Sequence, residues 1–268
     1  MIDLHSHLLP SIDDGAATIE ESREMLARFA QAGFTHLVTT PHLQTALDVG
    51  LSTRIERALD DVRQHAREFG LTIGLGFEHL LQIGTVERLE RGEPSRLDGS
   101  GAVLVEFPAF TWPGFAESAL FEMQIAGFAP VLAHPERYPQ VQDDPDLALD
   151  VAERGVVLQV TTASLVGALG SAAQKTSRTL LQRSLERQTL VILASDAHSP
   201  GRRLSQLTTG LNWIRQNYKD GNAVLNWTTN EVPSALLGKS ANSNDLLDQL
   251  RNTAPPPDRA RVRRFWFS

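Results

Sequence analysis

The chain has 268 residues, of which 41% are hydrophobic, and its formal net charge is −7 at pH 7. This composition suits one large α/β barrel or two small domains, and the acidic balance argues against nucleic acid as a partner. We expect a cytoplasmic protein, because no apolar run approaches the roughly 18 residues of a membrane span and the N-terminal motif lacks the basic and apolar regions of a signal peptide.

Cysteine is absent from the sequence. Disulfides, thiolate zinc sites and a cysteine nucleophile are therefore excluded. If the protein cleaves phosphate esters, it cannot form a cysteinyl-phosphate intermediate, and a metal-activated water molecule is the natural substitute.

Short apolar runs rich in β-branched residues alternate with longer helical patterns along most of the chain. The runs predict strands at 2–5, 36–40, 72–78, 102–107, 130–134, 156–161 and 190–195. The patterns between them predict helices at 18–32, 53–69, 83–91, 115–127, 145–154, 172–187 and 202–218. Thr18 and Gly33 are suitable N-terminal and C-terminal caps for the first helix, and Gly70 and Gly127 are placed to end later ones.

Seven strand–helix alternations predict a parallel α/β fold, either closed as a barrel or open and doubly wound. A Rossmann-type fold lacks support, because no Gly-x-Gly-x-x-Gly sequence follows the first strand. In a barrel, the C-terminal ends of all strands converge on one mouth, so polar residues at those ends would meet in space.

Polar residues do follow the predicted strands at this position. His5 and His7 end the first strand and face the same way, because side chains alternate along a strand. Further candidates come after later strands: His42, Glu78, Glu106, His134, Asp196 and His198. Five of the eight histidines occupy such positions, so we expect a metal site. Structural hydrogen bonds at the barrel mouth would explain one or two of these residues, but not the whole set.

These residues resemble the motifs of the polymerase and histidinol phosphatase (PHP) superfamily, and more narrowly its bacterial capsule-type protein-tyrosine phosphatases. The matching elements are His5-Ser6-His7 with Asp13-Asp14-Gly15, Thr40-Pro41-His42, Gly76-Phe77-Glu78, Val105-Glu106-Phe107, Ala133-His134-Pro135-Glu136-Arg137-Tyr138, and Ser195-Asp196-Ala197-His198 with Arg203. The resemblance covers residues 1–237 and implies a distorted TIM-like (β/α)7 barrel of the PHP type.

The resemblance also implies three divalent ions. The first would be bound by His5, His7, Glu78 and Asp196, the second by Glu78, Glu106 and His134, and the third by Asp14, His42 and His198. Arg137 and Arg203 would hold the substrate phosphate, so these arginines, with His42 and Asp14, are the expected catalytic residues. The mixed nitrogen and oxygen ligands suit Mn²⁺, Fe²⁺ or Zn²⁺, and Mn²⁺ is the ion we expect.

The implied activity is hydrolysis of phosphotyrosine on a protein, with a bacterial tyrosine kinase that controls capsular or exopolysaccharide synthesis and export as the expected partner. Two alternatives remain at this point: a phosphatase for a small phosphomonoester such as histidinol phosphate, and a non-catalytic, metal-bound module that regulates a kinase. The substrate rim departs from the family pattern at Leu43-Gln44-Thr45-Ala46, at His79-Leu80-Leu81, and at Thr161, where relatives often have Asn.

Several of these residues have structural explanations as well. Glu106 would be satisfied inside a barrel by a neighbouring lysine or arginine, and Arg137 would pair with Glu136 or Asp144. His79 is expected to face away from the ligands. His36 and His65 are interpreted as ordinary strand-start and helix-surface residues.

Beyond residue 237 the character of the sequence changes, and 238–268 is expected to be an extension of the barrel domain. Residues 245–251 suggest a short helix, Pro255-Pro256-Pro257 an extended spacer, and 259–267 a basic, aromatic end. The extension is either a disordered tail or a segment that supports an oligomer or contact with an anionic membrane surface.

Overall fold

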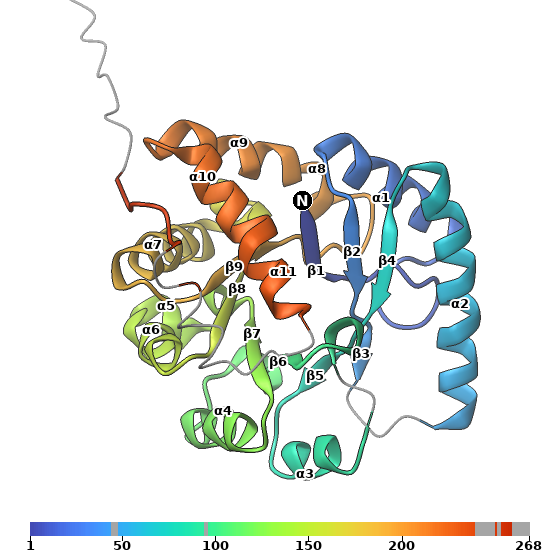
Figure 1. Ribbon diagram of the computed structural model, residues 1–268, viewed down its shortest axis with the longest axis horizontal. Helices are drawn as coiled ribbons and strands as arrows, with labels where there is room; N and C mark the ends of the chain where they lie inside the picture. The colour runs from blue at the N-terminus through green and yellow to red at the C-terminus, as the bar shows by residue number, and fades with distance from the viewer. Residues whose placement is uncertain (44–47, 94–95, 239–249, 251–252, 259–268) are drawn as a thin grey trace, which may run out of the picture.

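The computed structural model describes residues 1–43, 48–93, 96–238, 250 and 253–258, in which parallel strands form two sheets. The three-stranded sheet has the order β1 (Ile2–Ser6), β2 (His36–Thr39), β4 (Thr72–Leu75). The six-stranded sheet has the order β3 (His42–Leu43), β5 (Glu78–Leu80), β6 (Ala102–Glu106), β7 (Ala129–Ala133), β8 (Val157–Thr161), β9 (Val191–Ala194). The predicted α/β fold on parallel strands is confirmed (Figure 1).

Backbone hydrogen bonds connect the two sheets at both junctions. Between β2/β3 and β4/β5, the amide of Gly76 donates to Thr39 O at 2.9 Å and the amide of Glu78 donates to Pro41 O at 3.2 Å. At the other junction, the amide of Asp196 donates to His5 O at 2.9 Å, which links the segment that follows β9 to β1. The predicted strands are thus bonded in cyclic order, as in a distorted barrel. The strand expected at 36–40 ends at Thr39 and is followed by the short β3, and the strand expected at 72–78 is interrupted between β4 and β5.

Helices surround these strands on the outside (Figure 1). The first seven are α1 (Ile19–Ala32), α2 (Val49–Glu68), α3 (Thr85–Glu90), α4 (Ala116–Ile125), α5 (Pro139–Asp143), α6 (Asp146–Glu153) and α7 (Ser171–Arg187). They are followed by α8 (Arg202–Ser205), α9 (Leu207–Asn217), α10 (Gly221–Asn226), the π-helical turn Trp227–Glu231 and α11 (Val232–Leu236). No described helix is both long and apolar enough to cross a membrane.

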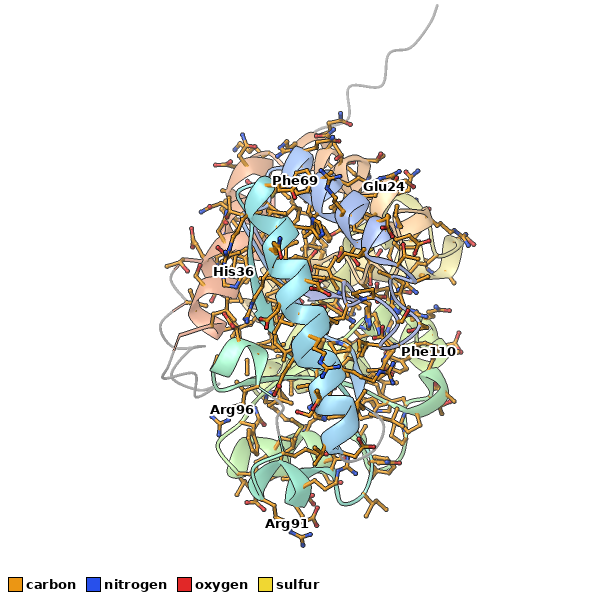
Figure 2. All side chains as sticks on the ribbon, turned by 90° about the vertical axis from the view of Figure 1, so that its right-hand side faces the viewer. Glu24, His36, Phe69, Arg91, Arg96 and Phe110 are labelled. Carbon is orange, nitrogen blue, oxygen red and sulfur yellow. The ribbon has the colours of Figure 1, made fainter. Side chains whose placement is uncertain are left out.

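Local sequence chemistry explains most helix ends. The hydroxyl of Thr18 accepts from the amide of Glu21 at 3.3 Å, and Gly33 adopts a left-handed φ of 90°, so both predicted caps of α1 are confirmed. Helix α2 begins earlier than predicted, because the carboxylate of Asp48 accepts from the amide of Leu51 at 2.8 Å and caps it there. This long helix covers the side of the molecule that faces the viewer in Figure 2.

The helical segment 202–236 was predicted only in part. The helix expected at 202–218 is divided into α8 and α9, and the segment 221–236 forms three further helical turns. The π-helical turn and α11 pack against β1 and β9 and bury Trp227, Val232 and Leu236.

Part of the C-terminal extension lies against the helices. The side-chain amide of Gln182 on α7 donates to Pro257 O at 2.9 Å, and the backbone amide of Lys219 donates to Asp258 O at 2.9 Å. Pro255 is buried, so the proline spacer is docked on the barrel surface. The helix predicted at 245–251, apart from Leu250, and the basic, aromatic end at 259–267 lie outside the described residues.

Candidate metal centre

The residues predicted to bind metal lie together at the C-terminal ends of the strands. Their donor atoms form four overlapping groups, within each of which the atoms lie within 4.8 Å of one another. The groups are His7, Asp14, His42, His198; His5, His7, Asp196; His5, Glu78, His134; and His42, Glu78, Glu106. All except the fully buried His5 and His7 line a cavity of about 550 Å³, which Arg137 and Arg203 also line.

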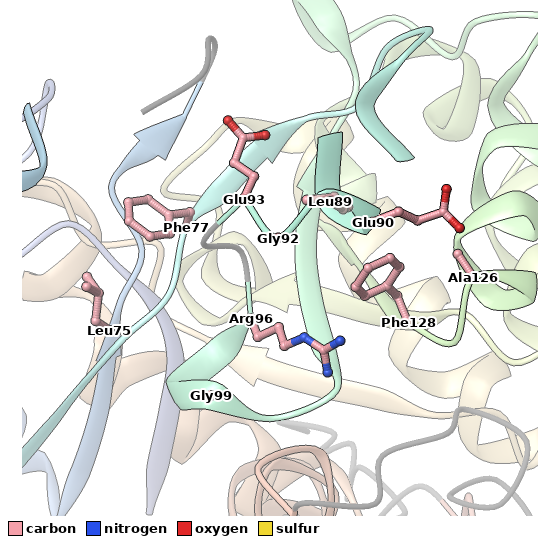
Figure 3. A pocket seen from close by; sticks show the side chains of 10 residues that line it. All are labelled: Leu75, Phe77, Leu89, Glu90, Gly92, Glu93, Arg96, Gly99, Ala126 and Phe128. Carbon is pink, nitrogen blue, oxygen red and sulfur yellow. The ribbon is translucent and has the colours of Figure 1, made fainter. Parts of the chain in front are cut away.

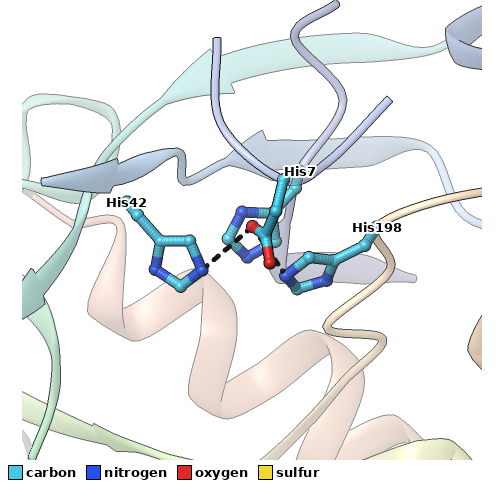
Figure 4. A group of neighbouring side chains, drawn as sticks. His7, His42 and His198 are labelled. Atoms are coloured by element: carbon cyan, nitrogen blue, oxygen red, sulfur yellow. Dashed lines mark ion pairs between the residues drawn. The ribbon is translucent and has the colours of Figure 1, made fainter. Parts of the chain in front are cut away.

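These groups cut across the three ligand sets that the resemblance implies. Asp14, His42 and His198 do lie together, since Asp14 Oδ1 is 3.3 Å from His42 Nε2 and 3.4 Å from His198 Nε2 (Figure 4). His7 joins them, because its ring stacks on His198 with the centroids 3.8 Å apart. The expected set of Glu78, Glu106 and His134 is instead divided between two groups that share Glu78.

Glu78 occupies the centre of the cluster. Its Oε2 lies 3.1 Å from both His5 Nε2 and His42 Nδ1, and its Oε1 lies 2.9 Å from His134 Nε2. Burial opposes ionisation of this carboxyl, but the charge of His5 and the hydrogen bonds from the imidazoles hold the pKa of Glu78 well below its usual range. Glu78 is the residue that the group of His5 and His134 shares with the group of His42 and Glu106.

Glu106 is a second carboxyl at the same place. Its oxygens lie 3.5 Å from His42 Nδ1 and 3.8 Å from His134 Nε2, and no lysine or arginine of the described residues lies within ion-pair distance of it. Burial and the negative charge of Glu78 raise the pKa of Glu106 to about 8. The neighbouring lysine or arginine that would have explained Glu106 structurally is therefore not found, and two adjacent carboxyls share one site without a permanent cation between them.

The two histidines of the His-x-His motif are held with their Nε2 atoms facing inward. His5 Nδ1 lies 2.9 Å from the side-chain oxygen of Gln159, and His7 Nδ1 lies 2.7 Å from Asp13 Oδ2. Both partners accept, so both Nδ1 atoms carry the proton. The two Nε2 atoms are only 3.2 Å apart, and as lone pairs they would repel each other unless a cation lies between them. Either protons or a metal ion can supply that cation, so this arrangement fits a metal site.

The same contacts determine the protonation state of His7. Burial by itself lowers the pKa of this imidazole, but the hydrogen bonds to Asp13 and Glu78 outweigh burial and raise the pKa of His7 to about 10. Burial also acts on Asp13, but its bonds to His7 and to the amides of Gly15 and His42 lower the pKa of Asp13 to about 2. A metal ion that binds His7 must therefore displace a proton from it.

Local backbone geometry brings the ligands to this mouth. Gly15 is required after Asp13-Asp14, because a Cβ there would lie 2.5 Å from both the Cβ and the carbonyl oxygen of His7. His134 and Asp196 follow the ends of β7 and β9 with left-handed φ angles of 37° and 49°. Such angles are unfavourable for residues other than glycine, and strain of this kind concentrates at functional sites.

Both predicted phosphate-binding arginines approach Asp196 from the rim. Arg203 Nη1 lies 2.7 Å from Asp196 Oδ1, and Arg137 Nη1 lies 3.3 Å from Asp196 Oδ2. Arg137 pairs with neither Glu136 nor Asp144, the partners that a purely structural role would require. Its guanidinium instead lies 4.1 Å from the centroid of the Phe110 ring, a cation–π contact that fixes its direction.

Glu136 does not pair with Arg137, which was the role considered from the sequence. Its Oε1 accepts from the amide of Thr161 at 3.0 Å and from the hydroxyl of Ser164 at 2.8 Å, so it fastens the end of β8 to the loop after β7. Burial raises the pKa of Glu136. Thr161, where relatives often have Asn, therefore takes part in a buried structural contact.

The remaining histidines lie outside the four groups. His36 is 3.4 Å from Asp98, and His65 on the surface of α2 is 3.2 Å from Glu68. His79 is buried on β5, and burial, together with the charge of Arg88, lowers the pKa of its imidazole to about 4. The rest of the atypical rim after Leu43, residues 44–46, lies outside the described residues.

A larger cavity, of about 680 Å³, lies elsewhere and has different chemistry (Figure 3). Its wall carries Glu90, Glu93 and Arg96 among apolar side chains, and the Arg96 guanidinium lies 5.2 Å from the centroid of the Phe128 ring. It contains none of the four groups of donor atoms. Size alone would therefore select the wrong cavity for the chemistry.

Three residues of the site were missed in the sequence: Gln159, Asp13 as the partner of His7, and Phe110. Gln159 is the single polar residue inside the apolar run Val157–Val160, which is a usable signal for a side chain that points into a polar interior. Phe110 gives no such signal, because its position follows from two successive left-handed residues, Ala109 and Phe110, with φ of 53° and 50°.

Comparison with known proteins identifies the family. The family model for capsular polysaccharide synthesis proteins CpsB/CapC matches residues 1–234. The chain belongs to the CpsB/CapC family.

Individual CpsB/CapC relatives agree with this assignment. The tyrosine-protein phosphatase YwqE of Bacillus subtilis is 30% identical over 201 residues, which are 74% of this chain and 78% of the relative. The tyrosine-protein phosphatase CpsB of Streptococcus pneumoniae is 27% identical over 225 residues, 81% of this chain and 91% of the relative. The resemblance to capsule-type tyrosine phosphatases is thus confirmed.

Solved structures support the same conclusion. One from the crystallographic work on YwqE and CpsB, described as metal-dependent tyrosine phosphatases, matches 88% of this chain and 94% of its own with a TM-score of 0.72 and 26% identity. The lactonase Lmo2620 of Listeria monocytogenes matches with a TM-score of 0.57 at 13% identity, which shows a shared fold only.

Proposed function

We propose that this CpsB/CapC chain is a metal-dependent phosphatase that hydrolyses phosphotyrosine on a protein. The observation that carries the proposal is the cavity at which nitrogen and oxygen donors from six of the seven predicted strand ends meet two arginines. Arginines at the rim of a multinuclear metal site form a natural phosphate-binding arrangement.

The cluster has enough donors for three divalent ions. Their proposed ligands are those implied by the family: His5, His7, Glu78 and Asp196; Glu78, Glu106 and His134; Asp14, His42 and His198. The absence of sulfur and the mixture of imidazole and carboxylate are consistent with Mn²⁺, which we propose ahead of Fe²⁺ and Zn²⁺. When bound, such ions polarise a phosphoryl oxygen and lower the pKa of a coordinated water molecule.

The residues of the chain then hold and orient the substrate. We assign the nonbridging phosphate oxygens to Arg137 and Arg203, whose guanidinium groups Asp196 and Phe110 keep directed at the cavity. Arginine suits this task because its planar fork binds phosphate through two hydrogen bonds. Leu43, Leu51 and Phe110 provide an apolar wall of the same cavity against which a phenyl ring can pack.

The leaving group also fits this chemistry. A tyrosine phenol has a pKa near 10, so its anion leaves with less help from a proton donor than an alkoxide does. We therefore assign no dedicated general acid, and because the chain lacks cysteine no cysteinyl-phosphate intermediate forms. The proposed reaction is direct transfer of the phosphoryl group to water.

The proposed substrate is a bacterial tyrosine kinase of capsular or exopolysaccharide export. The support is the family assignment, because the named relatives are tyrosine-protein phosphatases and the family model concerns capsular polysaccharide synthesis. We propose a cytoplasmic location, in keeping with the proposed kinase substrate. Nucleic acid is not a proposed partner of a chain with a net charge of −7.

We further propose that 1–237 is the catalytic domain and that 238–268 attaches to it as an extension that supports an oligomer or membrane-surface contact. Because Pro257 and Asp258 bond to the barrel, the informative truncation removes 259–268 only. Loss of an oligomer by light scattering, or of binding to anionic liposomes, would support a docking role. Unchanged oligomeric state and unchanged liposome binding would remove it.

Competing substrates provide the test of the proposed function. Turnover of phosphotyrosine peptides should exceed that of histidinol phosphate, and both chelation and His42→Ala should abolish it. A protein that hydrolyses only small phosphomonoesters would contradict the proposed substrate. Undiminished peptide hydrolysis in both His42→Ala and Arg137→Ala would contradict the proposed site.

A further inference from the structure

A smaller cavity, of about 300 Å³, adjoins the catalytic cavity and shares a wall with it. Arg137 lines both cavities. The smaller one, here named the arginine subsite, is lined by Arg137, Gln142, Leu169, Gly170, Ala173 and Arg202. Two side chains from adjacent positions thus face different cavities, with Arg203 lining the catalytic one and Arg202 the subsite.

The arginine subsite has the opposite charge character to the catalytic cavity. Several carboxylates line the catalytic cavity, among them Glu78, Glu106 and Asp196. The lining of the subsite, within the described part of the chain, includes two guanidinium groups and no carboxylate. The nearest acidic neighbour of Arg137 in sequence, Glu136, does not line the subsite, and its Oε1 accepts from the amide of Thr161 and the hydroxyl of Ser164.

Arg202 is available to an external anion. It is the first residue of α8 and is exposed. Within the described part of the chain, no carboxylate lies within 4.0 Å of its guanidinium, whereas Arg203 beside it is bonded to Asp196. An unpaired cation beside a catalytic cavity has no evident structural purpose.

The other walls of the subsite do not oppose an anion. Gly170 and Ala173 come from the start of α7, whose first turn has no acidic residue and no side-chain cap. The partial positive charge of this helix end adds modestly to that of the two arginines. The site nevertheless rests on the cavity and the paired arginines, with the helix end as a minor contribution.

We propose that the arginine subsite binds a second negatively charged group of the substrate, located on the same peptide within a few residues of the phosphotyrosine. This group is a carboxylate of aspartate or glutamate, or the phosphate of a second phosphotyrosine. The inference rests on the proposed function, because it requires a phosphotyrosine in the adjoining cavity. Consecutive residues of an extended peptide are about 3.3–3.6 Å apart, so a residue a few positions away reaches a cavity that shares one wall.

The overall charge of the chain makes a preference for acidic peptides a specific sign of a local binding site. The chain has a net charge of −7, so its overall field repels an acidic peptide more than a neutral one. A preference for acidic flanks must therefore arise locally. It should also weaken as salt increases, because contacts on partly exposed arginines are screened.

The experiment compares phosphotyrosine peptides that have neutral, aspartate-containing, second-phosphotyrosine or lysine-containing flanks. We expect the metal-loaded protein to favour both acidic peptides over the neutral one by about five- to tenfold in kcat/KM, mainly through KM. Arg202→Gln should reduce this ratio to below about twofold, and Arg202→Lys should keep part of it. Arg57→Gln, which removes an exposed arginine from α2, is the matched control and should keep the full ratio.

The ratio compares kcat/KM for acidic and neutral peptides with the same enzyme variant. A general loss of activity therefore does not change it. A preference confined to the second phosphotyrosine, or shared by aspartate, identifies the source of the anion and supports the subsite. A wild-type ratio near 1, or the same ratio in the wild type and Arg202→Gln, would overturn it.

Binding separates this inference from the proposed function. Fluorescence anisotropy with labelled peptides that carry a non-hydrolysable phosphonate in place of phosphotyrosine measures the same preference without turnover. If no phosphotyrosine peptide is hydrolysed, the proposed function fails. The subsite then stands only if the wild type still binds the acidic phosphonate peptides about fivefold more tightly and Arg202→Gln does not.

Discussion

Replacing Gln159 with leucine should weaken divalent-metal binding about 10- to 100-fold, although Gln159 is not a proposed ligand. Its side-chain oxygen accepts from His5 Nδ1 at 2.9 Å and from the backbone amide of His134 at 3.0 Å. These bonds fix the tautomer and the ring direction of His5 and the backbone of His134. Loss of such an outer contact to a ligating histidine costs about 10- to 100-fold in metal affinity.

The same substitution should lower the free energy of unfolding of the metal-free protein. Gln159 is fully buried, and leucine of similar size would leave two buried donors, His5 Nδ1–H and His134 N–H, without an acceptor. Each unsatisfied donor costs about 1–3 kcal/mol. The expected loss for the two donors is therefore about 2–6 kcal/mol, measured by urea denaturation in the presence of a chelator.

Metal affinity is measured by competition with a chromophoric chelator, together with the metal content of the purified protein. Gln159→Glu is the matched control, because its carboxylate keeps the acceptor and the replaced Nε2 has no hydrogen-bond partner. Its affinity should stay within a few-fold of wild type or increase. Wild-type affinity in Gln159→Leu, or equal losses in both variants, would refute the reasoning.

Further consequences follow from the same contacts. Metal affinity should rise between pH 6 and 9, because the pKa values of Glu106 and His7 are raised to about 8 and about 10 and protons compete with the metal below those values. Each proton that the metal displaces makes the affinity change by about tenfold per pH unit. An affinity that calorimetry finds to be independent of pH would contradict this prediction. Arg203→Lys should lower kcat/KM for a phosphotyrosine peptide by about 10- to 100-fold with metal content unchanged, because lysine cannot bind phosphate through two parallel bonds; full activity would exclude the assigned role. Phe110→Ala should raise KM for an aryl phosphate about 3- to 10-fold, since both the apolar wall and the support of Arg137 are lost; an unchanged KM would remove Phe110 from substrate binding.

The sequence was sufficient to bring most of the predicted ligands together, because all of them except Asp14 lie at or just after the end of a predicted strand. The alternation of a strand put His5 and His7 on one face, and the convergence of parallel strands brought His134 and Asp196 to the same mouth. These inferences depend on backbone periodicity alone, which a single sequence reveals. The grouping of the ligands was less predictable, because it depends on side-chain directions such as that of His7 toward His198.

The differences in the fold have local physical causes. The strand predicted at 36–40 ends at Thr39, shortly before Pro41, which has no amide proton to donate to a sheet. The next strand is interrupted at Gly76, where a Cβ would lie 2.7 Å from Leu97 Cδ2. Helix α10 and the turns after it were missed because their apolar residues pack against α9, β1 and β9, tertiary contacts that no local pattern in 221–236 indicates.

Partners of individual side chains were also beyond the sequence. Arg137 was compatible with Glu136 or Asp144 as neighbours along the chain, but it pairs with Asp196, which is distant in sequence. Gln159 was visible as a polar residue in an apolar strand, yet its partner His5 became evident only from the paired strand ends. Contacts of this kind are set by the closed order of the strands.

The most direct measurement of the central claim combines elemental analysis of gently purified protein with phosphotyrosine-peptide hydrolysis before and after chelation. We predict about three equivalents of divalent metal per chain, loss of activity when chelation removes them, and recovery on addition of Mn²⁺. Full hydrolysis of the peptide by protein shown to be free of metal would contradict the account.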